Sequence, residues 1–369
     1  MNITIDLGNY NTIITYDEAG LPASEVLKGA ARNMPVGERA ILVPSVINLE
    51  GGRVAIGKEV TRAGLYGKDS TFRDLRDYIL HSTPMGLLVD GRRVSHKEAA
   101  SIFLNEIVRR MRDQTSRQID VSLIHPTYEG EDFVNWVKSV SLSEARSVTL
   151  VDEDTAVALG YGVNLFKDDT IVFFDFGFSS IRARLVKFNW LGRESYTLPL
   201  VKASAMYPVG SADIKQRIIR QLEFQGYSHD EKTGRRHVLH ESSFSTEEFI
   251  AYAEREDLGA LVDNVVERLW EEAEARGIDK SIVKKVCLIG GATRIPSVKA
   301  ALERHFGEKL LGDMPETSAG LGGITFLGDR PTDDMIRSGY SMRVRDPVTG
   351  QYHFPLVVER FTRFPTKNP

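Results

Sequence analysis

The sequence has 369 residues, 42% of them hydrophobic and 27% charged, which is typical of a globular protein large enough for two cores. A formal net charge of -4 and a pI near 6.1 argue against a nucleic-acid partner. The single cysteine, Cys287, excludes an internal disulfide and fits a reducing compartment, and no stretch is typical of a membrane span or a signal peptide. We therefore expect a cytoplasmic protein that binds neither membrane nor nucleic acid.

The first half of the chain opens with strands and continues into helices. Apolar and β-branched residues on both sides of Gly8 predict two strands joined by a turn, and residues 40–57 predict further strands with a hairpin at Gly51-Gly52. A capping box over residues 95–98 predicts the start of a helix. A buried strand over residues 121–126, a helix over 131–146, and a strand leading into a helix that ends near Gly160 follow. The buried face of the helix after residue 95 comprises Ala100, Phe103, Leu104, Ile107, Val108 and Met111.

The second half repeats this order. The run TIVFFDFGFSSIRARLVKF predicts two strands, and residues 204–244 predict a loop or a small excursion. A second capping box, residues 245–248, precedes a long helix that ends at Gly277. A strand over residues 283–291 and a helix over 297–306 come next, and the small residues of 318–323 suit close helix packing. The last segment predicts a hairpin around residues 346–350.

Two strand–turn–strand units stand about half a chain apart. IDLGNYNTI, from residue 5, and FDFGFSSI, from residue 174, each place an aspartate, an apolar residue and a glycine at the end of an apolar strand. This repetition predicts a duplicated α/β fold. A glycine turn lets backbone N–H groups approach a phosphate, and the aspartate beside it suits Mg²⁺ held through water. The pair therefore predicts a site that binds a polyphosphate from two sides.

A third segment, CLIGGATRIPSV from residue 287, adds a site for a flat ring. Gly290-Gly291 at a strand end would let the ring lie against the backbone, and Arg294 could stack on it. Together with the two turns, the segment predicts a nucleotide as the ligand.

These motifs resemble the nucleotide-binding domain of the 70-kDa heat-shock chaperone family, within the actin/hexokinase-like ATPase superfamily. IDLGNYNT resembles the first phosphate motif of that family, FFDFGFSS the second, VDEDTAVALGYG the connecting motif and LIGGATRIPSV the adenosine motif. The order and spacing agree over about residues 1–328. The resemblance implies an α/β, duplicated actin-like ATPase fold, with two lobes that each have a mixed β-sheet flanked by helices and a nucleotide cleft between them.

The resemblance also implies roles for individual residues. Asp6 and Asp175 would organise Mg²⁺ through water, Glu153 would position the attacking water, and Arg76 stands where the family has a lysine that reaches the γ-phosphate. ATP and ADP, with Mg²⁺, are the implied cofactors. The residues implied to bind the nucleotide are Gly8, Asn9, Tyr10, Asn11, Gly177, Phe178, Ser179, Ser180, Gly290, Gly291, Ala292, Arg294, Ile295 and Glu316.

Several residues depart from the family pattern. The second phosphate turn carries Phe178 and Ser179 where glycines are usual, and Arg182 replaces an aspartate just after it. The outer part of the second lobe, about residues 213–245, is shorter than in a typical chaperone. We expect weaker ATP binding than in the family, and slow hydrolysis.

The predicted organisation is a first lobe over residues 1–163, a second over 164–328, and a linker with a C-terminal hairpin over 329–369 that resembles the start of a peptide-binding β-domain. The predicted function is the ATP-binding domain of a divergent heat-shock-type chaperone, monomeric, with slow hydrolysis driving lobe movement. Its partners would be the nucleotide and, through the C-terminal region, an unfolded peptide or a co-chaperone. The alternatives are a pseudo-ATPase that acts as a regulator or co-chaperone, an actin-like filament protein and a small-molecule kinase.

Overall fold

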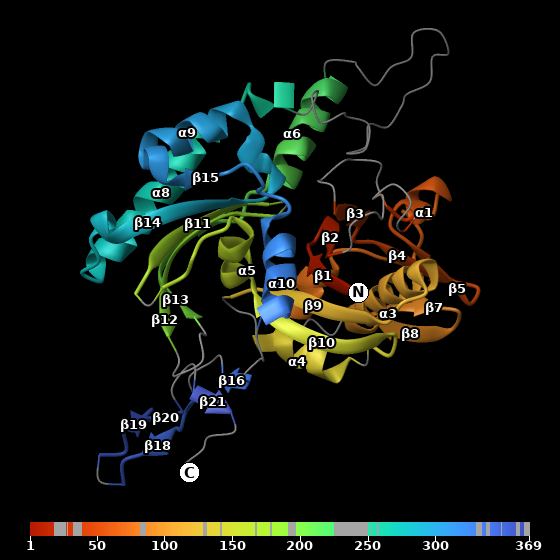
Figure 1. Cartoon of the computed structure of the whole chain (residues 1–369), viewed down its shortest axis with the longest axis horizontal. Helices are drawn as coiled ribbons and strands as arrows, with labels where there is room; N and C mark the ends of the chain where they lie inside the picture. The colour runs from red at the N-terminus through yellow and green to blue at the C-terminus, as the bar shows by residue number, and fades with distance from the viewer. Residues whose placement is uncertain are drawn as a thin grey trace.

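The structure is a computed structural model with two five-stranded mixed sheets, flanked by helices (Figure 1). The predicted architecture is confirmed: it is a two-lobed actin-like ATPase fold of class α/β. Phe178 and the predicted capping box at 245–248 lie outside the described residues. The described residues are 1–17, 27, 29–31, 39–81, 86–127, 131–140, 142–166, 168–177, 179–190, 197–224, 250–251, 253–256, 258–329, 334–336, 340–347, 349–358 and 362–364.

The first sheet has the strand order β10-β9-β1-β2-β3. Its central strand β1 pairs antiparallel with β2 and parallel with β9, and β10 extends the parallel side. Asp6 lies near the end of β1, opposite Ile13 of β2. The strands are β1 (Asn2–Leu7), β2 (Asn11–Tyr16), β3 (Ala40–Pro44), β9 (Ile119–His125) and β10 (Ala145–Asp152).

The second sheet repeats this topology in the order β13-β12-β11-β14-β15. Its central strand β11 pairs antiparallel with β12 and parallel with β14, as β1 does with β2 and β9. Asp175 lies in β11 at the position that Asp6 has in β1, and Arg182 of β12 lies opposite it. The strands are β11 (Thr170–Phe176), β12 (Ile181–Trp190), β13 (Thr197–Tyr207), β14 (Val283–Ile289) and β15 (Leu310–Leu311).

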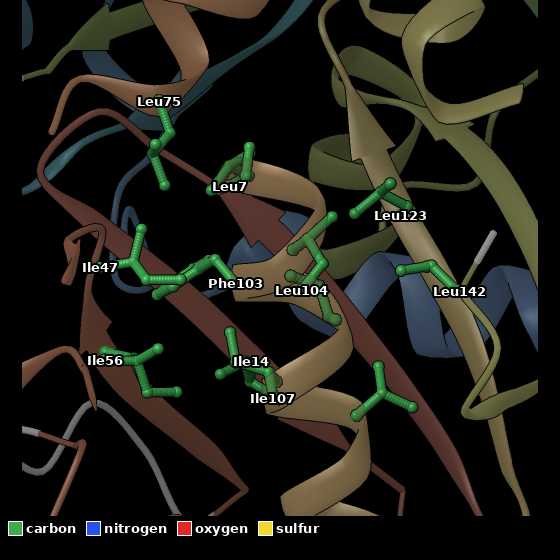
Figure 2. Close-up of a cluster of buried hydrophobic side chains, with 14 of the residues drawn as sticks. Leu7, Ile14, Ile47, Ile56, Leu75, Phe103, Leu104, Ile107, Leu123 and Leu142 are labelled. Carbon is green, nitrogen blue, oxygen red and sulfur yellow. The ribbon is translucent and has the colours of Figure 1, made fainter. Parts of the chain in front are cut away.

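The outer faces of the two sheets are covered by helices. The first sheet packs against α3, whose predicted apolar face is buried in full (Figure 2). The second sheet packs against α8 and α9 (Figure 1). The helices outside the lobe junction are α1 (Lys58–Arg62), α2 (Leu75–Leu80), α3 (His96–Thr115), α4 (Glu131–Ser139), α6 (Ser211–Phe224), α8 (Leu258–Ala275) and α9 (Pro296–Phe306).

The inner faces meet at two crossing helices, α5 (Glu153–Gly160) and α10 (Ser318–Asp329), which lie between the sheets in Figure 1. A Cβ on Gly160 would overlap the carbonyl of Ser318, and a Cβ on Gly322 would overlap the carbonyl of Ala156. The predicted close packing of the small-residue run is therefore confirmed. Ala156 and Ala319 join side chains of both sheets in one apolar cluster, which links the two lobes.

Two predictions about elements are wrong. The helix predicted over 131–146 ends at Ser139, and β10 begins at Ala145. Residues 211–224, predicted to belong to a loop or small excursion, form α6, which buries Ile214 in the second lobe. The isoleucines and leucines of 214–222 recur at helical spacing, a signal that the neighbouring polar run obscured.

The remaining strands form small sheets at the edges of the lobes and near the C-terminus. The predicted hairpin around residues 346–350 is confirmed, since β18 and β19 pair antiparallel across it. Among the described residues, no helix combines the length and apolar character needed to cross a bilayer. The strands are β4 (Ile47–Glu50), β5 (Arg53–Ile56), β6 (Thr71–Phe72), β7 (Gly86–Val89), β8 (Arg92–Ser95), β16 (Asp334–Ile336), β17 (Tyr340–Ser341), β18 (Val344–Arg345), β19 (Tyr352–His353), β20 (Leu356–Val358) and β21 (Thr362–Phe364).

Candidate functional site

The two glycine turns meet at the junction of the lobes. Asn9, in the first turn, donates from Nδ2 to Oγ of Ser179 in the second turn at 3.1 Å. Asp77 of α2 holds the same side-chain amide. Its Oδ1 accepts from Nδ2 of Asn9 at 2.7 Å, and its backbone N–H donates to Oδ1 of Asn9 at 3.0 Å. Turns that are 170 residues apart in sequence are thus in direct contact.

Glycine is sterically required in the first turn but not in the second. A Cβ on Gly8 would lie 2.5 Å from the carbonyl oxygen of Asn11, so the first turn itself requires glycine. A Cβ on Gly177 would meet only ordinary contacts, the nearest at 3.4 Å to a carboxylate oxygen of Asp175. Gly177 and Ser180 are bridged by a backbone hydrogen bond of 3.0 Å, which closes the second turn.

The carboxylates predicted at the site lie close enough to interact. Burial raises the pKa of Asp6 to about 6, against the opposing effect of Arg76. Burial and the neighbouring Glu153 raise the pKa of Asp175 to about 6, while the nearby arginines act the other way. Both aspartates therefore carry their charge at neutral pH, at a cost in stability.

Glu153, the first residue of α5, is held by two arginines. Its Oε1 accepts from Nη2 of Arg76 at 3.4 Å, and its Oε2 accepts from Nη2 of Arg184 at 3.1 Å. Burial acts to raise the pKa of Glu153, but the charges of Arg76 and Arg184 outweigh it, and the pKa is lowered. Arg76 and Glu153, which the resemblance assigns to the γ-phosphate and to the attacking water, are thus paired with each other in the structure.

The sequence did not point to Arg184 or Asp154. Arg184 is 2% exposed and also binds Asp154 at 2.7 Å. Burial raises the pKa of Asp154 to about 6. The signal was the spacing: Arg184 stands two residues after Arg182 on the strand that returns from the turn, so both share the face that carries Asp175.

The third predicted segment lies at the end of β14, next to the second turn. Gly290 has a φ of +85°, and a Cβ on it would overlap the carbonyl of Phe176, so the backbones of β14 and β11 approach closely only because glycine stands there. Gly291 begins a short 3-10 helix, Gly291–Arg294. Arg294 forms a bidentate ion pair with Glu316 at 2.7 and 2.8 Å.

The other predicted binding residues take different places. Ala292 and Ile295 are buried in the core of the second lobe, so only their backbone could face a ligand. The ring of Tyr10 lies under the ammonium of Lys215, 4.9 Å from its centroid, and so links the first turn to α6. Asn11 begins β2.

The residues present fit a resident Mg²⁺ poorly. Mg²⁺ takes oxygen ligands in octahedral geometry, and Asp6 and Asp175 could supply two carboxylates. Arg76 already acts on both aspartates, and Arg182 and Arg184 act on Asp175. A guanidinium supplies positive charge but no lone pair for a metal. In the described part of the chain, no three His, Cys, Asp or Glu side chains are placed to hold a metal ion.

The comparison with known families matches a part of the second lobe that includes the segment after β14. A family model described as Hsp70 protein matches residues 236–319. The match spans α8, β14, the 3-10 helix and α9, and it includes Arg294 and Glu316. This part of the chain is therefore similar to Hsp70 proteins, the family that the sequence motifs resemble.

Proposed function

We propose that this chain is a nucleotide-binding module of the Hsp70 type that binds ATP and ADP at the junction of its two lobes and hydrolyses ATP slowly. The observation that carries the proposal is the direct contact of two equivalent glycine turns, through Asn9 and Ser179, with Asp6 and Asp175 at matching positions beside them. The partial match to Hsp70 proteins supports the same function.

The phosphates would be bound by the two turns. Backbone N–H groups around Gly8 and Gly177 and the hydroxyls of Ser179 and Ser180 are donors of the kind that anionic oxygens require. Arg76 adds a positive charge beside them. Binding across both turns would replace the hydrogen bond between Asn9 and Ser179. Nucleotide binding would thereby affect the relative position of the two lobes.

The adenosine would lie against the end of β14. The backbone at Gly290 and Gly291 has no Cβ to hold a ring away, and the guanidinium plane of Arg294 is positioned by Glu316. Arg294 is half exposed, as a side chain that stacks on a ligand has to be.

Glu153 would orient the attacking water. Its lowered pKa keeps it ionised at neutral pH, so it can accept a hydrogen bond from water. Each of its oxygens already accepts from an arginine, however, and a water has to compete with those bonds. This competition supports slow turnover.

The same ion pairs favour a second candidate, a pseudo-ATPase in which Glu153 is structural and nucleotide only sets the shape of the molecule. A partner would bind near the C-terminus, either as an unfolded peptide or as a co-chaperone. The residues there with large exposed apolar side chains are Tyr340, Met342, Val344, Tyr352, Phe354, Leu356 and Val357. A monomer in the cytoplasm stays the expectation from sequence.

Calorimetric titration with ATP and with ADP in buffer containing Mg²⁺, followed by phosphate release, tests the proposal. We expect binding, slow release of phosphate by the wild type, and release reduced by about tenfold or more in Glu153→Gln. Binding without phosphate release above the protein-free background would select the pseudo-ATPase. If neither nucleotide binds, both candidates are wrong.

A further inference from the structure

The strand that returns from the second turn carries two arginines on the face of the junction. In the register of β11 and β12, Arg182 lies opposite Asp175 and Arg184 lies opposite Phe173. The corresponding positions of β2 hold Ile13 and Thr15. Arginines at these strand positions are therefore a feature of the second lobe alone, although the two lobes share one topology.

The two arginines differ in their partners. Arg184 is fully buried and forms ion pairs with Glu153 and Asp154, so its charge is balanced within the protein. Arg182 is half buried, and the acceptor that it reaches among the described residues is the thioether sulfur of Met206, at 3.2 Å. A thioether is a weak acceptor, whereas a guanidinium has five N–H donors.

Both arginines and carboxylates act on Arg182. Burial and the charges of Arg184 and Arg76 lower its pKa, while Asp175 and Glu153 act in the opposite direction. An anion beside Arg182 would supply acceptors for its donors and would oppose the repulsion that Arg184 and Arg76 exert on it. A divalent cation in the same place would add to that repulsion.

We propose that Arg182, together with Arg76, binds the phosphates directly and takes the place of a divalent cation, so that the nucleotide binds as a metal-free anion. The proposal rests on the proposed function, since it needs a nucleotide at the junction. In a site of this kind, guanidinium groups take the place of a metal as the positive charges that act on Asp6 and Asp175. Arginine suits this role because its fork of donors matches two phosphate oxygens at once.

Calorimetry on the full chain with ATP, once in EDTA and once in excess MgCl₂, separates the possibilities. We expect the two affinities to agree within about threefold. If ATP binds with Mg²⁺ and about tenfold or more weakly in EDTA, this proposal is wrong and the proposed function stands. If ATP binds in neither buffer, both are wrong.

Variants assign the effect to the side chain. Arg182→Gln should weaken ATP binding in EDTA by about tenfold or more, because charge-assisted hydrogen bonds to phosphate are lost. MgCl₂ should restore part of the lost affinity. Arg182→Lys should keep part of the metal-free affinity, since it keeps the charge and loses the fork. Arg304→Gln, at an exposed ion pair on α9, is the matched control and should bind as the wild type does. Unchanged metal-free binding by a folded Arg182→Gln would overturn the proposal, and the wild-type comparison does not depend on any variant folding.

Discussion

Asp175 shows how the chemistry of single residues opposes the stability of this protein. Its pKa of about 6 in the folded protein lies above its ordinary value of 3.8. The folded protein therefore holds a proton on Asp175 over this range that the unfolded chain releases. The stability associated with the protonated group is present below pH 3.8 and is lost as the pH rises through 6.

We predict from this that Asp175→Asn stabilises the protein at neutral pH. The gain should be about 1–3 kcal/mol in the free energy of unfolding near pH 7.5, and it should shrink as the pH falls from about 6 toward 4. Denaturant titrations at several pH values measure it. Asp69→Asn, at an exposed position, serves as the control and should change little. A loss of stability, or a gain that does not depend on pH, would contradict the prediction.

At the site, sequence reasoning reached the residues that stand beside a motif. The aspartates and glycines of both turns could be found because each turn is local in sequence, and Arg76 because the helix around it resembles a known one. Arg184 could not be found in this way, because its role depends on which face of β12 meets α5. The contact of Asn9 with Ser179 depends on the docking of two lobes, which no local pattern encodes.

Among the elements, α5 and α10 pack so closely that two positions at their crossing have no room for a Cβ. Gly160 and Gly322 each face a backbone carbonyl of the other helix, and backbone cannot move aside as a flexible side chain can. The spacing of the two lobes is therefore set by residues without a Cβ.

We predict that Gly322→Ala destabilises the protein by about 3 kcal/mol, although alanine has the higher helix propensity by about 1 kcal/mol. The added methyl group would force α10 away from α5. Thermal unfolding measures the effect, with Gly67→Ala as the control, since a Cβ at Gly67 would meet nothing within 4 Å. A variant at Gly322 as stable as the wild type would show that the helices can separate without cost.

The elements that were predicted well are those whose signals are local. The helix α3 has both a cap, with Ser95 accepting from the N–H of Glu98 at 3.1 Å, and a continuous apolar face. The end of α4 was misjudged because nothing in residues 140–146 marks a boundary, and the change to strand comes from the pairing of β10 with β9. Tertiary pairing of this kind overrides local propensity.

At the scale of the whole molecule, Arg184 ties the two lobes together. It belongs to β12 of the second lobe and binds the first turn of α5, which follows β10 of the first. A hydrogen bond of 2.8 Å from the hydroxyl of Tyr161 to the carbonyl of Leu288 adds a second tie near the other end of α5.

We predict that Arg184→Gln lowers the free energy of unfolding by about 3–5 kcal/mol, because Asp154 then remains buried without its counter-charge and Glu153 keeps only Arg76. Denaturant titration measures the loss, and Arg304→Gln, at an exposed pair, should cost about 0.5 kcal/mol or less. If Arg184→Gln unfolds at the same denaturant concentration as the wild type, the ion pairs do not stabilise the contact between the lobes.

The single cysteine has a practical consequence for measuring how the lobes move. Cys287 is buried in β14, and burial raises the pKa of its thiol, so it reacts slowly with maleimides and similar reagents. New cysteines introduced on exposed positions of each lobe can therefore carry fluorophores or spin labels while Cys287 stays in place. The distance between two such labels, followed with and without nucleotide, would report directly whether binding draws the lobes together.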